Sequence, residues 1–187
     1  MNKLKVIVLS ILAISVFTYI GAVIGYNIPR ENVQAEQSKQ AHIYTPEELV
    51  AEINKLRAKK GVPPLKIDER LNQSAYLAAR DMQRYKYYEH ENPVTKEKHT
   101  QYAINNTGQD CKLVSENINV VNSWVNPVTD SSGGWITSST HNEAQLDEKY
   151  DNVGFASFVV DFKYKYDGKY STSPQEVIYI VHFCDLR

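Results

Sequence analysis

Three side chains in this sequence are candidates for a functional site: His90 and His141, which each lie at the edge of a helical element where a side chain can face a cleft, and Glu116. They occur in the segments YYEHENP, SENI and WITSSTHNEAQL. Glu116 lies between the hydrophobic residues Leu113-Val114 and Ile118, where a carboxylate is either an acid at a helix start or a site group. Taken singly, each residue is more often structural or solvated, because exposed polar residues only sometimes mark a site.

The other three histidines have simpler interpretations. His42 lies in a polar linker and His99 in a lysine-bearing loop, so we expect both to be solvated. His182 lies in the last apolar segment on the same face as Cys184, since alternate residues of a strand share a face. We expect His182 to be a hydrogen-bonded histidine of the core or its rim.

Two predicted amphipathic helices precede His90 in the sequence and must position it. Thr45, Pro46 and Glu48 have the spacing of a capping box with proline at the first helical position. Asp68 is expected to cap the second helix. The apolar stripe predicted for that helix consists of Leu71, Ala75, Ala78, Met82 and Tyr85.

Strands are predicted in the second half of the chain. Residues 157–166 alternate between apolar and polar side chains, which indicates a half-buried strand. Residues 176–184 are apolar on both faces, which is typical of a central or doubly covered strand. Residues 91–110 are polar and irregular. Helices first and paired strands last predict an α+β fold with an antiparallel sheet.

The N-terminal residues 1–28 are expected to be a membrane anchor or a signal sequence. Lys3 and Lys5 precede an uncharged run from Val6 to Tyr26, long enough as a helix to cross a bilayer core of about 30 Å. The lysines favour a cytoplasmic N-terminus. A signal peptide has a shorter apolar region of about 7–15 residues, so we favour an anchor, with secretion after cleavage near Ala35 as the alternative.

Residues 29–43 are expected to form a polar linker, and residues 44–187 are expected to form one domain outside the cytoplasm. Both cysteines, Cys111 and Cys184, lie in this domain, and an even count in an oxidising compartment suggests one disulfide bond. Two buried free thiols are the alternative, and a zinc pair is disfavoured because no C-x-x-C spacing is present. The formal net charge of −1 gives no broad attraction to nucleic acid.

Five segments, in this order, resemble the CAP superfamily, the secreted group that includes cysteine-rich secretory proteins, and most closely its bacterial SCP-like branch. The resemblance covers nearly all of residues 44–184. It rests on the Ala75-x-x-Ala78-x-x-x-Met82 spacing, YYEHENP, SENI with Ser115 in place of the usual glycine, Trp135-x-x-Ser138-x-x-His141-x-x-x-x-Leu146, and Tyr150-x-x-Val153-Gly154-Phe155.

This resemblance implies a three-layer α–β–α sandwich with helices on both faces of an antiparallel sheet. It also implies a central cavity lined by His90, Glu116 and His141, which binds zinc or another divalent ion in some members. Ser138 stands where many eukaryotic members have a second cavity glutamate, so a metal would be held less tightly here. The long stretch 119–134 is expected to shape the rim of the cavity.

Three functions are consistent with these residues. The first is a binding module for a small ligand, a lipid or a surface protein. The second is a metal-assisted hydrolase of peptide or cell-wall bonds with Glu116 as general base. The third is a purely structural surface domain. Ser115 and Ser138 lack a G-x-S-x-G context, so no nucleophile favours catalysis. We rank binding first and leave enzymatic activity open.

Overall fold

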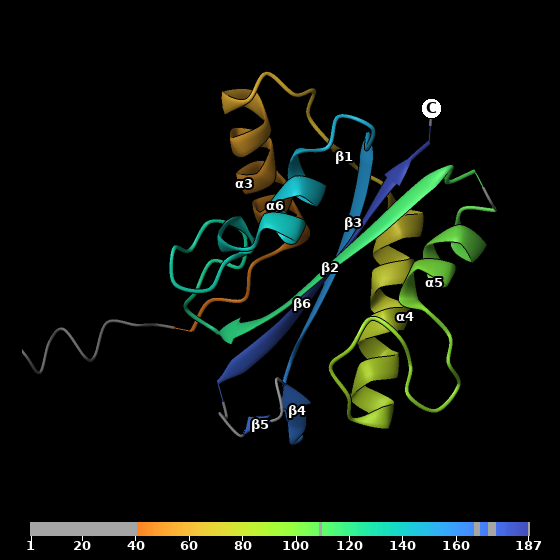
Figure 1. The fold of residues 1–187 in the computed structure, drawn as a ribbon, viewed down its shortest axis with the longest axis vertical. Coiled ribbons are helices and arrows are strands. Elements are labelled where there is room, and N and C mark those ends of the chain that lie inside the picture. The colour runs from red at the N-terminus through yellow and green to blue at the C-terminus, as the bar shows by residue number, and fades with distance from the viewer. Residues whose placement is uncertain (1–40, 109, 167–168, 172–174, 187) are drawn as a thin grey trace, which may run out of the picture. The chain divides into compact units, whose positions relative to one another are not determined.

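A computed structural model describes residues 41–108, 110–166, 169–171 and 175–186 (Figure 1). Four strands form one sheet in the order β1 (Lys66–Ile67), β3 (Asn152–Val159), β6 (Glu176–Asp185) and β2 (Leu113–Asn122). Strand β6 is antiparallel to both of its neighbours, and β1 pairs in parallel with β3. The predicted N-terminal anchor lies outside the described residues. Among the helices that are described, none has the length and apolar character needed to cross a membrane.

Helices cover both faces of this sheet (Figure 1). Helices α3 (Pro46–Lys59) and α6 (Ser139–Leu146) lie on one face, and α4 (Glu69–Tyr85) and α5 (His99–Asn106) lie on the other. Alternate residues of β6 enter two different cores, with Val181 on the α3 side and Ile180 on the α4 side. Residues 177–184 of β6 are all buried, as the two-sided apolar pattern predicted. The mixed α/β architecture with two helical layers agrees with the predicted fold class, except that the sheet is not purely antiparallel, because the short β1 pairs in parallel with β3.

The predicted helix starts are confirmed. The Thr45 hydroxyl accepts a hydrogen bond from Glu48 N, and the Glu48 carboxylate accepts one from Thr45 N, which completes a capping box. The Asp68 carboxylate accepts from Arg70 N at the start of α4. In the predicted stripe of α4, Leu71, Ala75, Ala78 and Met82 are buried. Tyr85 was wrongly included, because it lies in the last turn of α4 and remains 36% exposed.

Two parts of the strand prediction need correction. Residues 113–122 form the ten-residue strand β2, which the sequence pattern did not indicate. The strand predicted over 157–166 is interrupted: β3 ends at Val159, and Tyr164–Tyr166 forms β4, which pairs with β5 (Lys169–Ser171). The interruption follows from the partner strand. Val160 N still donates to Glu176 O, where β6 begins, and among the described residues the pairing of β3 with β6 ends there.

The predicted disulfide bond between Cys111 and Cys184 is present, with a Cα–Cα distance of 5.6 Å. It joins the residues just before β2 to the end of β6. Both cysteines are buried beside Leu71 and Ala103, so the bond also ties the sheet to the α4 and α5 layer.

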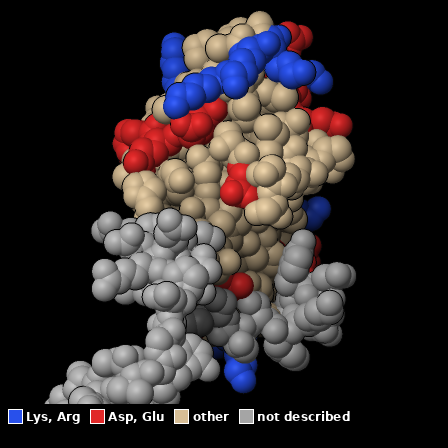
Figure 2. All heavy atoms as spheres, turned by 90° about the vertical axis from the view of Figure 1, so that its left-hand side faces the viewer, with Lys and Arg blue, Asp and Glu red and all other residues tan. Residues whose placement is uncertain are grey.

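Viewed from the side of α3 and α6, the described surface carries separate small groups of basic and acidic side chains with neutral areas between them (Figure 2). No broad field of one sign covers the part of this face that the described residues form.

Helix α4 lies very close to the sheet at Gly154 of β3. A Cβ atom added there would lie 2.1 Å from Leu71 C and 2.2 Å from Asn72 N, which are backbone atoms of α4. Asn72 also accepts a hydrogen bond from Phe155 N at 2.9 Å, so the first turns of α4 are fixed against β3. The small residue at this position therefore determines how close α4 lies to the sheet.

We expect Gly154→Ala to lower the free energy of unfolding by at least about 2–3 kcal/mol, because backbone atoms of a packed helix must move to admit the methyl group. Urea denaturation of the domain measures this change. Gly133→Ala is the matched control, since nothing lies within 4 Å of a Cβ at that position. Equal stability of the two variants would contradict the interpretation of Gly154 as a packing constraint.

Candidate functional site

Glu116 lies in the middle of β2, directly opposite His182 of β6. Both side chains lie on the face of the sheet that α4 and α5 cover. The other imidazoles near Glu116 come from two further segments. His99 is the first residue of α5, and His90 belongs to the segment that follows α4. That segment begins at Lys86, whose positive φ of 57° ends the helix and redirects the chain toward β2.

The Glu116 carboxylate contacts three imidazoles. Its Oε1 lies 2.6 Å from His90 Nδ1. Its Oε2 lies 3.0 Å from His99 Nδ1 and 2.9 Å from His182 Nε2. The Glu116 side chain is only 2% exposed. A buried carboxylate is stable only when it is paired and hydrogen-bonded, and here the imidazoles of three separate segments provide those partners.

Two of these imidazoles are fixed at their second nitrogen as well. His182 Nδ1 lies 2.6 Å from the Ser74 hydroxyl of α4. His99 Nε2 lies 2.6 Å from the Tyr87 hydroxyl. His99 and His182 are fully buried, whereas the His90 side chain is 56% exposed. His90 is therefore the only one of the three whose imidazole reaches solvent.

His141 approaches from the other face of the sheet. It lies on α6, and its backbone carbonyl accepts a hydrogen bond of 2.8 Å from Asn117 Nδ2. Asn117 follows Glu116 in β2, so the two side chains point to opposite faces. β2 is an edge strand of the sheet, and His90 and His141 lie beside it on opposite faces, near enough for the charge of His90 to lower the pKa of His141. We call this part of the surface the His90–His141 edge.

The pKa values of the three predicted site residues are shifted in different directions. Burial raises the pKa of Glu116, but hydrogen bonds from His182, His90 and His99 outweigh burial and hold it well below its usual range. The hydrogen bond to Glu116 raises the pKa of His90 despite partial burial. Burial lowers the pKa of His141, and the charge of protonated His90 lowers it further. The edge therefore presents one imidazole that favours its cationic form and one that favours its neutral form.

The predictions for the two fully buried histidines had different outcomes. His182 is a hydrogen-bonded core residue, as expected. His99 was expected to be solvated, but it is fully buried against Glu116. The error arose because residues 91–110 were taken as irregular, whereas His99 begins α5. The only local signal was weak: His99 and Ala103, four residues apart, both face inward.

The three residues do not fit the predicted metal centre. Both Glu116 oxygens and Nδ1 of His90 are already engaged in hydrogen bonds. Within the described part of the chain, no group of three or more histidine, cysteine, aspartate or glutamate side chains is arranged to hold a metal ion. Two imidazoles remain, fewer than the three or four protein ligands of typical zinc sites. No metal chemistry follows from this arrangement.

The structure also places Ser138 and residues 119–134, the two other parts of the expected site. Ser138, at the position of the second acid, precedes α6 and makes no side-chain cap. Residues 119–134 were predicted to shape the rim of the cavity. The first of them belong to β2, which continues to Asn122, and only the residues after Asn122 form a loop. Asn119 Nδ2 donates to Gly133 O at 2.8 Å, which holds the end of this loop against β2.

Comparison with known proteins agrees with this architecture. The model of the cysteine-rich secretory protein family, CAP, matches residues 50–183. An outer surface protein from Borrelia burgdorferi is similar in structure, with a TM-score of 0.59, 22% identity, and coverage of 79% of this chain and 100% of that chain. A comparison with curated proteins gave no match.

Two further solved structures show weaker similarity. An extracellular protein containing a SCP domain from Bacillus anthracis gives a TM-score of 0.47 at 19% identity over 76% of this chain and 44% of that chain. A cysteine-rich secretory protein from Staphylococcus aureus gives a TM-score of 0.43 at 18% identity, over 73% of this chain and 36% of that chain. This chain therefore spans less than half the length of either protein.

We expect His90 to titrate above, and His141 below, the ordinary histidine pKa of about 6.5. A raised folded-state pKa means that the His90–Glu116 pair stabilises the fold fully below the unfolded pKa of His90. This contribution is lost as pH rises through the folded pKa.

Imidazole NMR signals followed across pH measure both values. His90→Ala should raise the pKa of His141, because the neighbouring positive charge is removed, and burial should still keep it below the ordinary value. His42→Ala serves as the control, since His42 pairs with Glu48 on the exposed surface. An unchanged His141 titration in His90→Ala would show that the two imidazoles do not interact.

Proposed function

Because the chain belongs to the cysteine-rich secretory protein family, we propose that it is an extracytoplasmic binding domain that holds a ligand or partner at the His90–His141 edge. The observation that carries this proposal is the state of Glu116. Its carboxylate is buried and contacts three imidazoles, while the His90 side chain is 56% exposed and His141 is half-buried. Buried Glu116 holds the His90 imidazole in position, and the His90–His141 edge is the surface at which a ligand can bind.

The same observation disfavours the hydrolase alternative. A general base must reach the proton that it removes and should have a pKa near the working pH. Glu116 is buried, its oxygens are occupied by histidine nitrogens, and its pKa is lowered. His90 and His141 remain as possible proton carriers, but neither has a hydroxyl or thiol nucleophile among its hydrogen-bond partners in the described residues.

An extracytoplasmic location is supported by three independent features. The Cys111–Cys184 bond requires an oxidising compartment in most organisms. The protein from Borrelia burgdorferi that is similar in structure is described as an outer surface protein. The N-terminal apolar run after Lys3 and Lys5 is the third. We propose membrane anchoring through this run, with secretion after cleavage near Ala35 as the alternative.

Purified peptidoglycan is the first probe, because a domain anchored on the outer side of a bacterial membrane faces this polymer. We expect the fluorescently labelled domain to cosediment with peptidoglycan and to release no soluble fragments. The His90→Ala/His141→Ala double variant should lose at least about tenfold in affinity, or about 1.4 kcal/mol.

A matched control is His42→Ala, which removes an imidazole from a different surface. Release of soluble fragments by the wild-type domain would overturn the binding proposal in favour of a hydrolase. Equal affinity of wild type and double variant would show that the edge is not the binding surface. Vesicles of phosphatidylglycerol and phosphatidylcholine, tested in parallel, would identify a lipid surface as the ligand instead.

A further inference from the structure

The two edges of the sheet differ in length and in protection. One edge ends on β1, which has only two residues, whereas the other ends on β2, which has ten. β2 contains no proline and no lysine, and its register with β6 is continuous from Leu113 to Asn122, without a bulge. Proteins commonly protect a sheet edge by a short strand, by lysine or proline, or by a bulge. β1 is protected in this way, and the outer edge of β2 is an open pairing surface.

The hydrogen bonds of β6 determine which backbone groups of β2 point outward. Val160 N donates to Glu176 O, so the even-numbered residues of β6 bond toward β3. Ser123 N donates to Gln175 O, so the odd-numbered residues of β6 bond toward β2. Alternate residues of an antiparallel strand carry these bonds. The even-numbered residues of β2 therefore direct their N–H and C=O groups away from the sheet: Val114, Glu116, Ile118 and Val120.

These outward groups are available for pairing. Among the described residues, no hydrogen bond is made to the outward N–H or C=O groups of Val114, Glu116, Ile118 or Val120. Glu116 as a whole residue is 8% exposed, but its side chain is only 2% exposed, so most of its exposed surface belongs to the backbone. A charged side chain that points inward can discourage pairing at an edge. Here the carboxylate is already matched by three imidazoles, so an added strand buries no unpaired charge.

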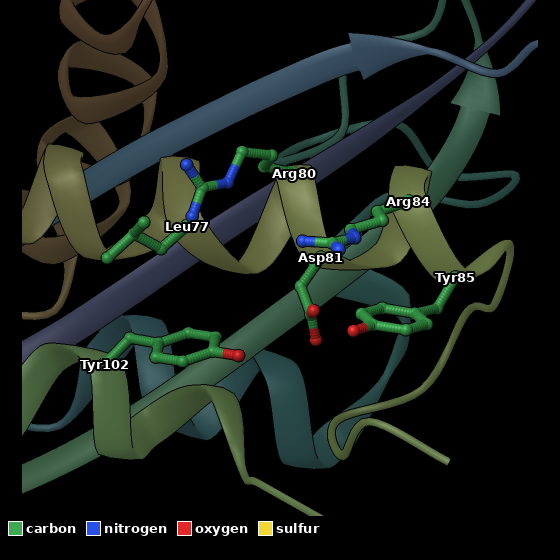
Figure 3. A pocket seen from close by; sticks show the side chains of 6 residues that line it. All are labelled: Leu77, Arg80, Asp81, Arg84, Tyr85 and Tyr102. Carbon is green, nitrogen blue, oxygen red and sulfur yellow. The ribbon is translucent and has the colours of Figure 1, made fainter. Parts of the chain in front are cut away.

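A pocket between α4 and α5 is a weaker candidate for a ligand. It has a volume of about 90 Å³, and the hydroxyl groups of Tyr85 and Tyr102 point toward the Asp81 carboxylate from opposite sides (Figure 3). Asp81 also accepts hydrogen bonds from the Tyr87 hydroxyl and from Asn92 Nδ2. The carboxylate of this pocket is thus satisfied by the protein's own donors, whereas the outer backbone of β2 is not.

The spacing of the outward groups matches a polypeptide backbone. In β2 an N–H and a C=O group recur together at every second residue, about 6.6–6.8 Å apart along the strand. Another extended chain presents the same pair of groups at the same spacing. The addition of such a chain to an exposed sheet edge is a recurring mode of peptide recognition, in which main-chain hydrogen bonds provide the affinity.

The side chains of an added strand would alternate between the two histidines of the His90–His141 edge. Successive residues of a strand point to opposite faces, and His90 and His141 lie beside β2 on opposite faces. The hydrogen bond with Glu116 raises the pKa of His90, whereas burial lowers the pKa of His141. An acidic side chain is therefore favoured on the His90 face, and an uncharged side chain is favoured on the His141 face.

A second copy of this chain suits the edge less well. Antiparallel pairing of two β2 strands relates the copies by a twofold axis perpendicular to the sheet. Both His90 imidazoles would then lie on the same face of the joined sheet. Each favours its cationic form, and like charges across a strand pair are destabilising. A peptide with an acidic side chain on this face has the complementary charge.

We propose that the outer edge of β2 binds an extended peptide segment of a partner protein as an added strand, with an acidic side chain beside His90. This inference rests on the proposed function, because it names the class of partner that the His90–His141 edge binds. The backbone of Val114, Glu116, Ile118 and Val120 pairs with the peptide, and the two histidines select its side chains on the two faces.

Amide hydrogen exchange, measured residue by residue by NMR on the ¹⁵N-labelled domain, tests the edge and its occupant. The probe is an acetylated and amidated heptapeptide in which valine and glutamate alternate. In the free domain, the N–H groups of Glu116 and Ile118 should exchange fast and those of Asn117 and Asn119 slowly, because only the latter bond to β6. Bound peptide should slow exchange at Glu116 and Ile118 by at least about tenfold.

A proline substitution tests the outward N–H groups directly. Val120→Pro removes one of them, and proline is tolerated in an edge strand where the N–H faces solvent. Val120→Ala is the matched variant, because it also shortens the side chain but keeps the N–H. We expect Val120→Pro to bind the peptide at least about tenfold more weakly than Val120→Ala, and backbone amide spectra establish that both are folded.

N-methylated peptides give the same test without a change in the protein. Only alternate residues of an added strand bond to the edge. N-methyl groups on one alternate set of peptide residues should therefore abolish binding, and those on the other set should leave it intact. An equal effect of the two sets would overturn the proposal, and so would the absence of saturable binding by the unmethylated peptide.

Two further outcomes concern the identity of the occupant. A valine–lysine heptapeptide should bind more weakly than the valine–glutamate peptide, and equal binding would overturn the assignment of an acidic side chain beside His90. Self-association of the free domain in analytical ultracentrifugation, with slow exchange at Glu116 and Ile118, would identify a second copy as the occupant instead.

Failure of this inference can be told apart from failure of the proposed function. Loss of peptidoglycan binding in His90→Ala/His141→Ala, without peptide binding by the wild type, would reject strand addition and retain the binding domain. Release of soluble fragments from peptidoglycan would reject the proposed function whatever the peptide does. Peptide binding by a domain that does not bind peptidoglycan would support strand addition and make a protein the partner.

Discussion

An ionised glutamate inside a protein must be matched by donors, and the arrangement of this domain around Glu116 follows from that constraint. Transfer of an unpaired carboxylate out of water costs more than the whole stability of a typical domain. The three imidazoles that contact it come from the segment after α4, from α5 and from β6. These segments are distant in sequence, so Glu116 is satisfied only after the sheet and the α4–α5 layer have assembled. The polar cluster therefore depends on the complete tertiary fold.

Small residues make this assembly possible. Gly154 of β3 pairs with His182 of β6, and the backbone of α4 at Leu71 and Asn72 lies directly against that glycine. Ser74 follows on the same helix and reaches His182 Nδ1 at 2.6 Å. A larger residue at 154 would push α4 outward and lengthen this contact. The close packing of helix against sheet thus also sets the geometry of the histidines.

Local sequence patterns predicted the starts of two helices and the central strand, because interactions between residues close in sequence determine these features. The capping residues Thr45 and Asp68 gave the starts of α3 and α4, and the two-sided apolar pattern gave β6. His90, Glu116 and His141 were found because the family motifs carry them, and the structure brings Glu116 into contact with His90. His99 could not be found in this way. Its burial results from a short helix without a side-chain cap and from contacts with β2 and Tyr87, which no local pattern encodes.

The two histidines at the edge are held by different layers, and this difference limits how they can respond to a ligand. His90 is tied to Glu116 and so to the α4–α5 layer. His141 is tied to α6, whose end is fixed by the buried Arg57 through hydrogen bonds to the carbonyls of Gln145 and Asp147. The hydrogen bond from Asn117 links His141 to the sheet through its backbone rather than through its imidazole. A shift of α6 along the edge strand would therefore change the separation of the two imidazoles while Glu116 and its three partners stay in place.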